Sequence, residues 1–132
     1  MTLVIISTFA SSGTIDEVEV AKTLCLDKSK VAQSDYYMRQ ARSYQREAEY
    51  YTRQAQGYDR EVEYYSKRAQ GYLREAEYYM KREKYDQAKD YQRRAKDATD
   101  KAESYKMKAD NARDKASSYM RKSELAIQKA NK

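Results

Sequence analysis

Alanine and tyrosine recur with a seven-residue period along most of the chain. The alanine row consists of Ala41, Ala48, Ala55, Val62, Ala69 and Ala76, and the tyrosine row consists of Tyr37, Tyr44, Tyr51, Tyr58, Tyr65, Tyr72 and Tyr79. Each tyrosine follows an alanine by three residues and precedes the next by four, which places alanine at position a and tyrosine at position d of a heptad. The pattern predicts an all-α fold built on a long amphipathic coiled-coil helix.

A third row, at position c of the heptad, repeats every fourteen residues. It alternates large and small residues in the order Tyr36, Ser43, Tyr50, Gly57, Tyr64, Gly71 and Tyr78. Glycine inside a helix costs about 1 kcal/mol relative to alanine, which favours a packing role for Gly57 and Gly71. We expect Tyr50 and Tyr64 to lie over these glycines of another helix, on a second contact face. The alternative is that the alternation reflects only duplication of a repeat unit.

The heptad register changes between Ala76 and Ala88, which are twelve residues apart. A turn within MKREKYD, residues 80–86, would fold the rod into an antiparallel αα-hairpin whose alanine-rich second arm lies on the tyrosine-rich first arm. The segment contains no Gly, Pro or Asn, however, and Asp86 is its one candidate cap. A twelve-residue step also nearly cancels the drift of the stripe on a straight helix. We therefore expect one helix from about Ser34 to Ala130, with the hairpin as the alternative.

The composition of the chain changes near Ser34. Residues 1–33 form an N-terminal head without tyrosine, and residues 34–132 form a rod with all 15 tyrosines and 24 basic against 17 acidic residues. In the head, TLVIIS at residues 2–7 predicts one β-strand, SSG at residues 11–13 a break, and Ser12 or Thr14 the cap of a short helix. Ser34 is the predicted N-cap of the rod.

Four acid–base pairs at i,i+4 spacing line the flank of the rod: Asp35–Arg39, Glu49–Arg53, Glu63–Lys67 and Glu77–Lys81. Each has the acid on the N-terminal side, the order that favours a helix. These pairs predict a solvated, continuous helical face.

The sequence contains no motif that indicates an enzyme. Glycine-rich phosphate loops, zinc-protease motifs and nucleophile elbows are all missing. The chain has no His and a single cysteine, Cys25, so we expect no metal site and no cofactor, and we expect Cys25 to pack as a small apolar residue. No apolar run reaches membrane length and no convincing signal peptide begins the chain, which favours a cytoplasmic location.

The segment KAESYKMKADNARDKASSYMRK, residues 101–122, resembles in pattern the alanine-zipper rods of bacterial envelope lipoproteins. The resemblance covers only the last third of the chain, and KTLC at residues 22–25 departs from the lipobox of that family.

Taken together, these patterns favour a structural subunit that assembles with copies of itself into a filament, fibre or bundle. The predicted assembly interface comprises the tyrosine row from Tyr37 to Tyr79, the alanines Ala41, Ala48, Ala55, Ala69 and Ala76, and the second face formed by Tyr50, Tyr64, Gly57 and Gly71. The alternative is a basic coiled-coil adaptor that binds nucleic acid or a membrane surface, since the rod carries a net charge of +7. Nucleic acid is less favoured because acids are mixed with the bases and tyrosine lies on the seam. A membrane surface is less favoured because tyrosine and alanine make a weak apolar face.

Overall fold

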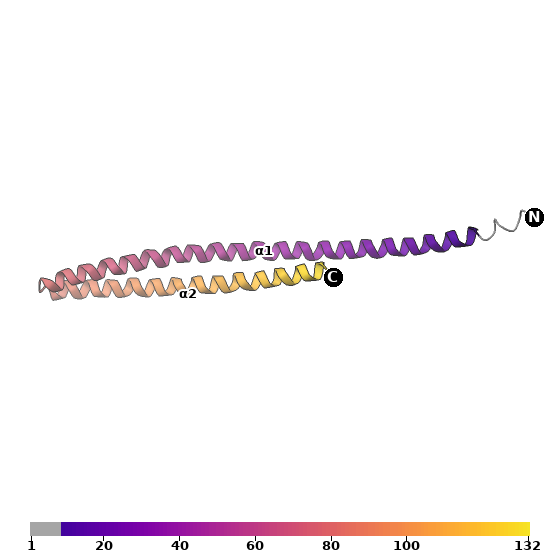
Figure 1. The fold of residues 1–132 in the computed structure, drawn as a ribbon. Coiled ribbons are helices and arrows are strands. Elements are labelled where there is room, and N and C mark those ends of the chain that lie inside the picture. Colours follow the sequence, from indigo (N-terminus) through magenta and orange to yellow (C-terminus); the bar gives the residue numbers. More distant parts are fainter. Residues whose placement is uncertain (1–8) are drawn as a thin grey trace, which may run out of the picture.

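The computed structural model describes residues 9–132, with side chains from residue 17 onward, and is built from two long helices. Helix α1 (Phe9–Lys81) and helix α2 (Tyr85–Ala130) run antiparallel and lie side by side along the whole of α2 (Figure 1). No strand occurs within residues 9–132. The all-α prediction is confirmed, and so is the hairpin alternative. The expectation of one continuous helix from Ser34 to Ala130 is wrong.

The chain reverses in a three-residue loop at residues 82–84. The backbone N–H of Lys84 donates to the carbonyl oxygen of Tyr79 (3.0 Å), and the N–H of Glu83 donates to that of Met80 (3.1 Å). This pair of bonds is the Schellman motif, in which one residue after the helix adopts a left-handed backbone. Glu83 is that residue, with φ of 56°. Glycine usually occupies this position, and the segment MKREKYD contains none, so its sequence gives no signal of a turn.

Helix α2 starts without the predicted cap. Lys84 occupies the N-cap position and makes no side-chain cap bond, whereas Asp86 lies in the first turn of the helix. A carboxylate in the first turn still interacts favourably with the positive end of the helix dipole. Asp86 therefore stabilises the start of α2 without marking where it begins.

The hairpin buries the alanine rows that a single helix would leave in water. Thirteen alanines are buried, among them Ala41, Ala48, Ala55, Ala69 and Ala76 of α1 and Ala88, Ala95, Ala102, Ala109 and Ala116 of α2. Each buried methyl group contributes roughly 0.8 kcal/mol, whereas the strained Glu83 costs about 1–2 kcal/mol and a short loop costs little entropy to close. The balance favours reversal of the chain.

Small side chains in row a let the two helix backbones approach closely. The hydroxyl of Ser123, which stands in the alanine row of α2, is buried and donates to the carbonyl oxygen of Ala41 in α1 at 3.1 Å. A side chain as short as serine reaches the facing backbone only where the helices are nearly in contact. This bond also shows the antiparallel register, with the end of α2 opposite Ala41.

Helix α1 crosses the predicted boundary between head and rod without interruption. Ser34 is an interior residue of α1 and not an N-cap, and Ser11–Gly13 lie within the helix and do not break it. Every residue from 17 to 33 is exposed, and shielding of side chains by α2 begins at Ser34. Cys25 is exposed and is not packed as predicted. The predicted strand at residues 2–7 lies outside the described residues.

The part of α1 that precedes Ser34 extends past the end of α2 (Figure 1). It exposes several large apolar side chains, namely Val18, Val20, Leu24, Leu26 and Val31. Neither described helix contains a stretch that is both long and apolar enough to cross a membrane.

Replacing Glu83 with glycine should stabilise the hairpin by about 1 kcal/mol, because glycine adopts the left-handed conformation without strain. Thermal unfolding followed by circular dichroism at low protein concentration measures the change. Glu75→Gly is the matched control, since the same substitution at an exposed site inside α1 should destabilise by about 1 kcal/mol. Equal destabilisation by both variants would contradict the role given to Glu83.

Replacing Ala109 with leucine should destabilise the hairpin by about 1–3 kcal/mol, because Ala109 is fully buried and a larger side chain must push the helices apart. Ala32→Leu is the control, since Ala32 is exposed on the part of α1 that α2 does not cover. Urea unfolding of the two variants compares them. A109L as stable as A32L would show that the alanine rows are not in close contact.

Candidate functional site

The tyrosine rows of the two helices meet along one edge of the hairpin, which we call the tyrosine edge. Tyr91, Tyr105 and Tyr119 of α2 each lie between two tyrosines of α1. Tyr105 stacks on Tyr65 with ring centroids 5.7 Å apart and an interplanar angle of 9°, and it contacts Tyr58 at 6.1 Å in a tilted arrangement. Tyr119 contacts Tyr51 and Tyr44 in the same two geometries, as does Tyr91 with Tyr79 and Tyr72. Aromatic pairs at such distances add stability beyond the area that they bury.

The c-row tyrosines extend each of these groups by one ring. Tyr50, Tyr64 and Tyr78 each meet the next residue of the chain edge to face, with centroids 5.1–5.2 Å apart. The hairpin therefore carries three clusters of four rings. They are Tyr44, Tyr50, Tyr51 and Tyr119; Tyr58, Tyr64, Tyr65 and Tyr105; and Tyr72, Tyr78, Tyr79 and Tyr91. Successive clusters are fourteen residues apart in both helices, so the repeat length of the two helices matches.

Side chains four residues further along α1 hold the hydroxyls of the c-row tyrosines. Gln40 donates to the hydroxyl of Tyr36 at 3.2 Å, and Gln54 donates to that of Tyr50 at 3.0 Å. Arg68 donates to two hydroxyls, those of Tyr64 (2.9 Å) and Tyr72 (2.6 Å). The bonds to Tyr72 and Tyr64 raise the pKa of the Arg68 guanidinium. These rings are thereby held in fixed orientations although they are about half exposed.

A row of six cations on α2 covers the tyrosine edge. They stand seven residues apart, at Arg94, Lys101, Lys108, Lys115, Lys122 and Lys129. Lys108 lies over the ring of Tyr105 in its own helix (4.9 Å), whereas Lys101 lies over the ring of Tyr65 in α1 (5.3 Å). The same alternation continues along the row. A cation lies over a ring of α2 where the residue three positions before it is tyrosine, and over a ring of α1 where that residue is alanine. Cations placed over tyrosine faces within about 6 Å stabilise the seam.

Sequence reasoning missed this cation row although its signal is in the sequence. Every seventh residue from Arg94 to Lys129 is basic. Each of these cations follows by three residues a member of the tyrosine row of α2, which is Tyr91, Ala98, Tyr105, Ala112, Tyr119 and Ala126. The overall mixture of acids and bases concealed it, because acids occupy neighbouring heptad positions. Testing each heptad position separately for charge would have found the row.

The predicted assembly residues divide into two groups in the structure. The rows from Tyr44 to Tyr79 and from Ala41 to Ala76 face α2 of the same chain, so they close the hairpin. Tyr37 lies beneath Lys129 of α2, with 5.7 Å between the ammonium and the ring centroid. The second face is different, since Tyr50 and Tyr64 are 52% and 51% exposed and a Cβ added at Gly57 or Gly71 would meet nothing within 4 Å. Whether a second copy covers this face remains a prediction.

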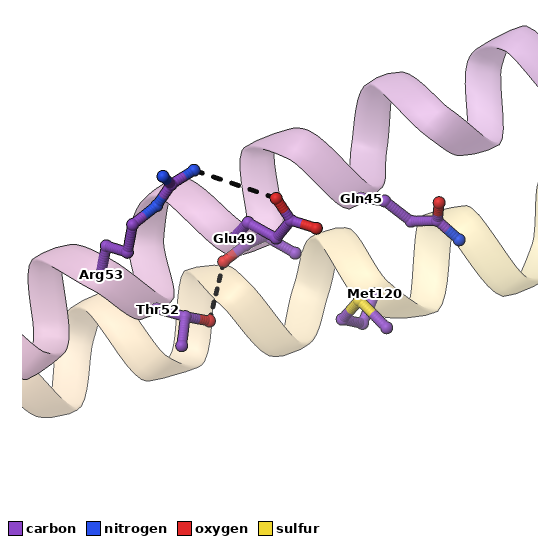
Figure 2. Close-up of a pocket in the computed structure, with 6 residues that line it drawn as sticks. Gln45, Glu49, Thr52, Arg53 and Met120 are labelled. Carbon is purple, nitrogen blue, oxygen red and sulfur yellow. Dashed lines mark hydrogen bonds and ion pairs between the residues drawn. The ribbon is translucent and has the colours of Figure 1, made fainter.

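The opposite edge of the hairpin, along the alanine rows, holds shallow pockets. One of them is lined by Gln45, Thr52 and Met120, beside the Glu49–Arg53 ion pair (Figure 2). Thr52 donates its hydroxyl to the carbonyl oxygen of Ala48 within its own helix. Since Thr52, Glu49 and Arg53 are already paired within α1, the pocket offers few groups to a ligand.

Ion pairs contribute at the surface of both helices. Three of the four predicted i,i+4 pairs form, at Glu49–Arg53, Glu63–Lys67 and Glu77–Lys81. The hydrogen bond and charge of Lys67 lower the pKa of Glu63, and those of Glu63 raise the pKa of Lys67. Within the described residues one ion pair joins the two helices, between Asp59 and Arg113, and its hydrogen bond raises the pKa of Arg113. All these groups are exposed, so their effect on stability is small.

Comparisons with protein-family models, with curated proteins and with solved structures find no match to this chain. The function is therefore inferred from the geometry of the hairpin itself.

Replacing Tyr105 with alanine should destabilise the hairpin by roughly 3 kcal/mol, because its ring lies between two rings of α1. Tyr64→Ala is the matched control, since Tyr64 belongs to the same cluster but is half exposed and should cost much less. Urea unfolding compares the two variants. If Y64A cost as much as Y105A, the clusters would not depend on contact between helices.

Proposed function

We propose that the protein is a structural subunit that assembles with copies of itself, and that the folded hairpin is the unit of assembly. The second face of α1, formed by Tyr36, Tyr50, Tyr64 and Tyr78 with the small residues between them, is the contact surface in this proposal. It replaces the coiled-coil seam that the sequence favoured, because the a and d rows are already covered by α2.

One observation carries the proposal, namely the open space at Gly57 and Gly71. Two glycines inside a 73-residue helix cost about 1 kcal/mol each relative to alanine. Nothing inside the hairpin requires them, since a Cβ at either position would meet no atom within 4 Å. A contact from outside the chain supplies a reason for their small size.

The spacing on this face suits packing against an identical face. Rings recur every fourteen residues, which is about 21 Å along a helix, with a small residue midway between them. A second copy displaced by half of this repeat places its rings over Ser43, Gly57 and Gly71. Edge-to-face support from the neighbouring seam tyrosine keeps each ring fixed, which lowers the entropy lost on binding.

Charges beside the second face are complementary under the same displacement. An acidic residue precedes each exposed ring, namely Asp35, Glu49, Glu63 or Glu77. An arginine, Arg46, Arg60 or Arg74, follows each small residue by three positions and makes no ion pair within the described residues. A ring placed over a small residue of another copy therefore brings an acidic residue towards an arginine. Such complementarity favours one register over others.

Replacing both Gly57 and Gly71 with leucine tests the proposal. Helix content and thermal stability should be kept or raised, since leucine is the better helix former and space is available. Assembly should be lost, because the leucines fill the space that the rings of a second copy require. Negative-stain electron microscopy and sedimentation velocity over a range of concentrations measure it.

The matched control is Gln56→Leu combined with Gln70→Leu. Both glutamines are exposed and precede the glycines in the sequence, but their side chains point about 100° away around the helix. The control should assemble like the wild type. Normal assembly of the glycine variant, or equal loss in the control, would show that the second face is not the contact. A wild-type chain that stays monomeric at high concentration would refute the proposal as a whole.

A further inference from the structure

The alternation of tyrosine and alanine in α2 leaves a gap between two successive tyrosine clusters. At Ala98, which is buried, α2 contributes no ring between Tyr65 and Tyr72 of α1. A cavity of about 230 Å³ opens there on the tyrosine edge. We call it the Ala98 notch. It has rigid walls, because Tyr65 is stacked on Tyr105 and Tyr72 contacts Tyr91.

Positive charge exceeds negative charge around this notch. Its lining includes three cations, Arg68, Arg94 and Lys101, and one carboxylate, Asp97. Arg94 is partly neutralised by Asp90, at 3.0 Å, but Asp90 also pairs with Arg93 at 2.7 Å. Like charges that face one small cavity repel one another, and an anion placed among them would relieve this repulsion.

The two cations without a carboxylate partner are held in place by tyrosines. No ion pair of the described residues includes Arg68 or Lys101. Arg68 donates to the hydroxyls of Tyr64 and Tyr72, and Lys101 lies over the ring of Tyr65. Neutral partners fix the two side chains but leave their positive charge uncompensated. A ligand therefore finds cations that are already positioned, which lowers the entropy cost of binding.

We propose that the Ala98 notch binds an oxyanion of the phosphate type, either free or as the terminal group of a larger molecule. The guanidinium of Arg68 and that of Arg94 offer planar pairs of N–H donors that suit tetrahedral oxyanions, and Lys101 adds a point charge. The hydroxyl of Tyr72 accepts a bond from Arg68 and keeps its own proton to donate to the anion. The volume is below the range of about 300–1,000 Å³ that is usual for drug-sized ligands, as a small anion requires.

The chain contains two related positions that differ in informative ways. Ala112 and Ala126 also interrupt the tyrosine row of α2, and each is likewise flanked by two cations, which are both lysines. The position of Arg68 is taken there by Gln54 and by Gln40, and Asn111 replaces Asp97 beside Ala112. The Ala98 notch alone combines a guanidinium on α1 with two cations on α2. These natural differences supply conservative substitutions for a test.

Arg68→Gln should weaken binding of inorganic phosphate about tenfold, because a charged hydrogen-bond donor is lost. Glutamine is the residue that the chain itself has at the two related positions, Gln54 and Gln40. Asp97→Asn should tighten binding about threefold, because it removes the one carboxylate of the lining. Isothermal titration calorimetry in a phosphate-free buffer of low ionic strength measures both, and circular dichroism verifies that the hairpin stays folded.

Arg42→Gln is the matched control for net charge. Arg42 is exposed on the same helix, does not line the notch and takes no part in the proposed contact between copies, so R42Q should bind phosphate like the wild type. Phenyl phosphate, titrated in parallel, distinguishes the two sources of the anion. Binding of both probes indicates a terminal phosphate group, whereas binding of inorganic phosphate alone indicates the free ion. Equal weakening by R42Q and R68Q, no effect of R68Q, or no binding of either probe by the wild type at millimolar concentration would overturn the proposal.

Discussion

The close approach of the two backbones along the alanine rows is the constraint on which the rest of the hairpin depends. Row a holds alanine or serine at almost every step, and the Ser123 hydroxyl reaches the carbonyl oxygen of Ala41 because nothing larger separates the helices. Side chains of this size contribute little apolar area each, so the stability of the hairpin comes from the number of contacts along about 70 Å of paired helix. In a rod of this kind, large side chains are mostly kept out of the alanine rows and lie on the tyrosine edge instead.

The tyrosine edge follows from that constraint. With the alanine edges nearly touching, the space on the other side fits three tyrosine rings for each fourteen residues, two from α1 and one from α2. Alanine stands in the tyrosine row of α2 at Ala98, Ala112 and Ala126, so the rings of the two helices meet in separate clusters. The same alternation decides where the lysines of α2 lie over rings of α1, and a notch opens at Ala98. The fourteen-residue repeat of α1 is thus matched by a repeat of equal length in α2.

The surface of the hairpin consequently carries two different regular patterns. On α1, rings that are about half exposed alternate with open glycines, and this is the region on which the assembly proposal rests. On the tyrosine edge, cations stand over rings and around small gaps, and the anion proposal rests there. Tyrosine serves both patterns, because its face packs while its hydroxyl remains available to glutamine or arginine.

The amino-acid sequence is enough to predict a helical rod from residue 34 onward, the rows a, c and d, and the alanine-rich second arm, because these depend on local propensity and on a period that can be counted. The cation row from Arg94 to Lys129 is also visible in the sequence, when the charged residues are counted separately for each heptad position. The reversal at residues 82–84 was decided by the tertiary structure. No local signal marks Glu83 as left-handed, and its strain is accepted because two helices bury their rows against each other. The tertiary contacts also decided that the tyrosine and alanine rows close one chain instead of joining several. A heptad pattern predicts that a helix packs on these rows, but it does not say whether that helix belongs to the same chain.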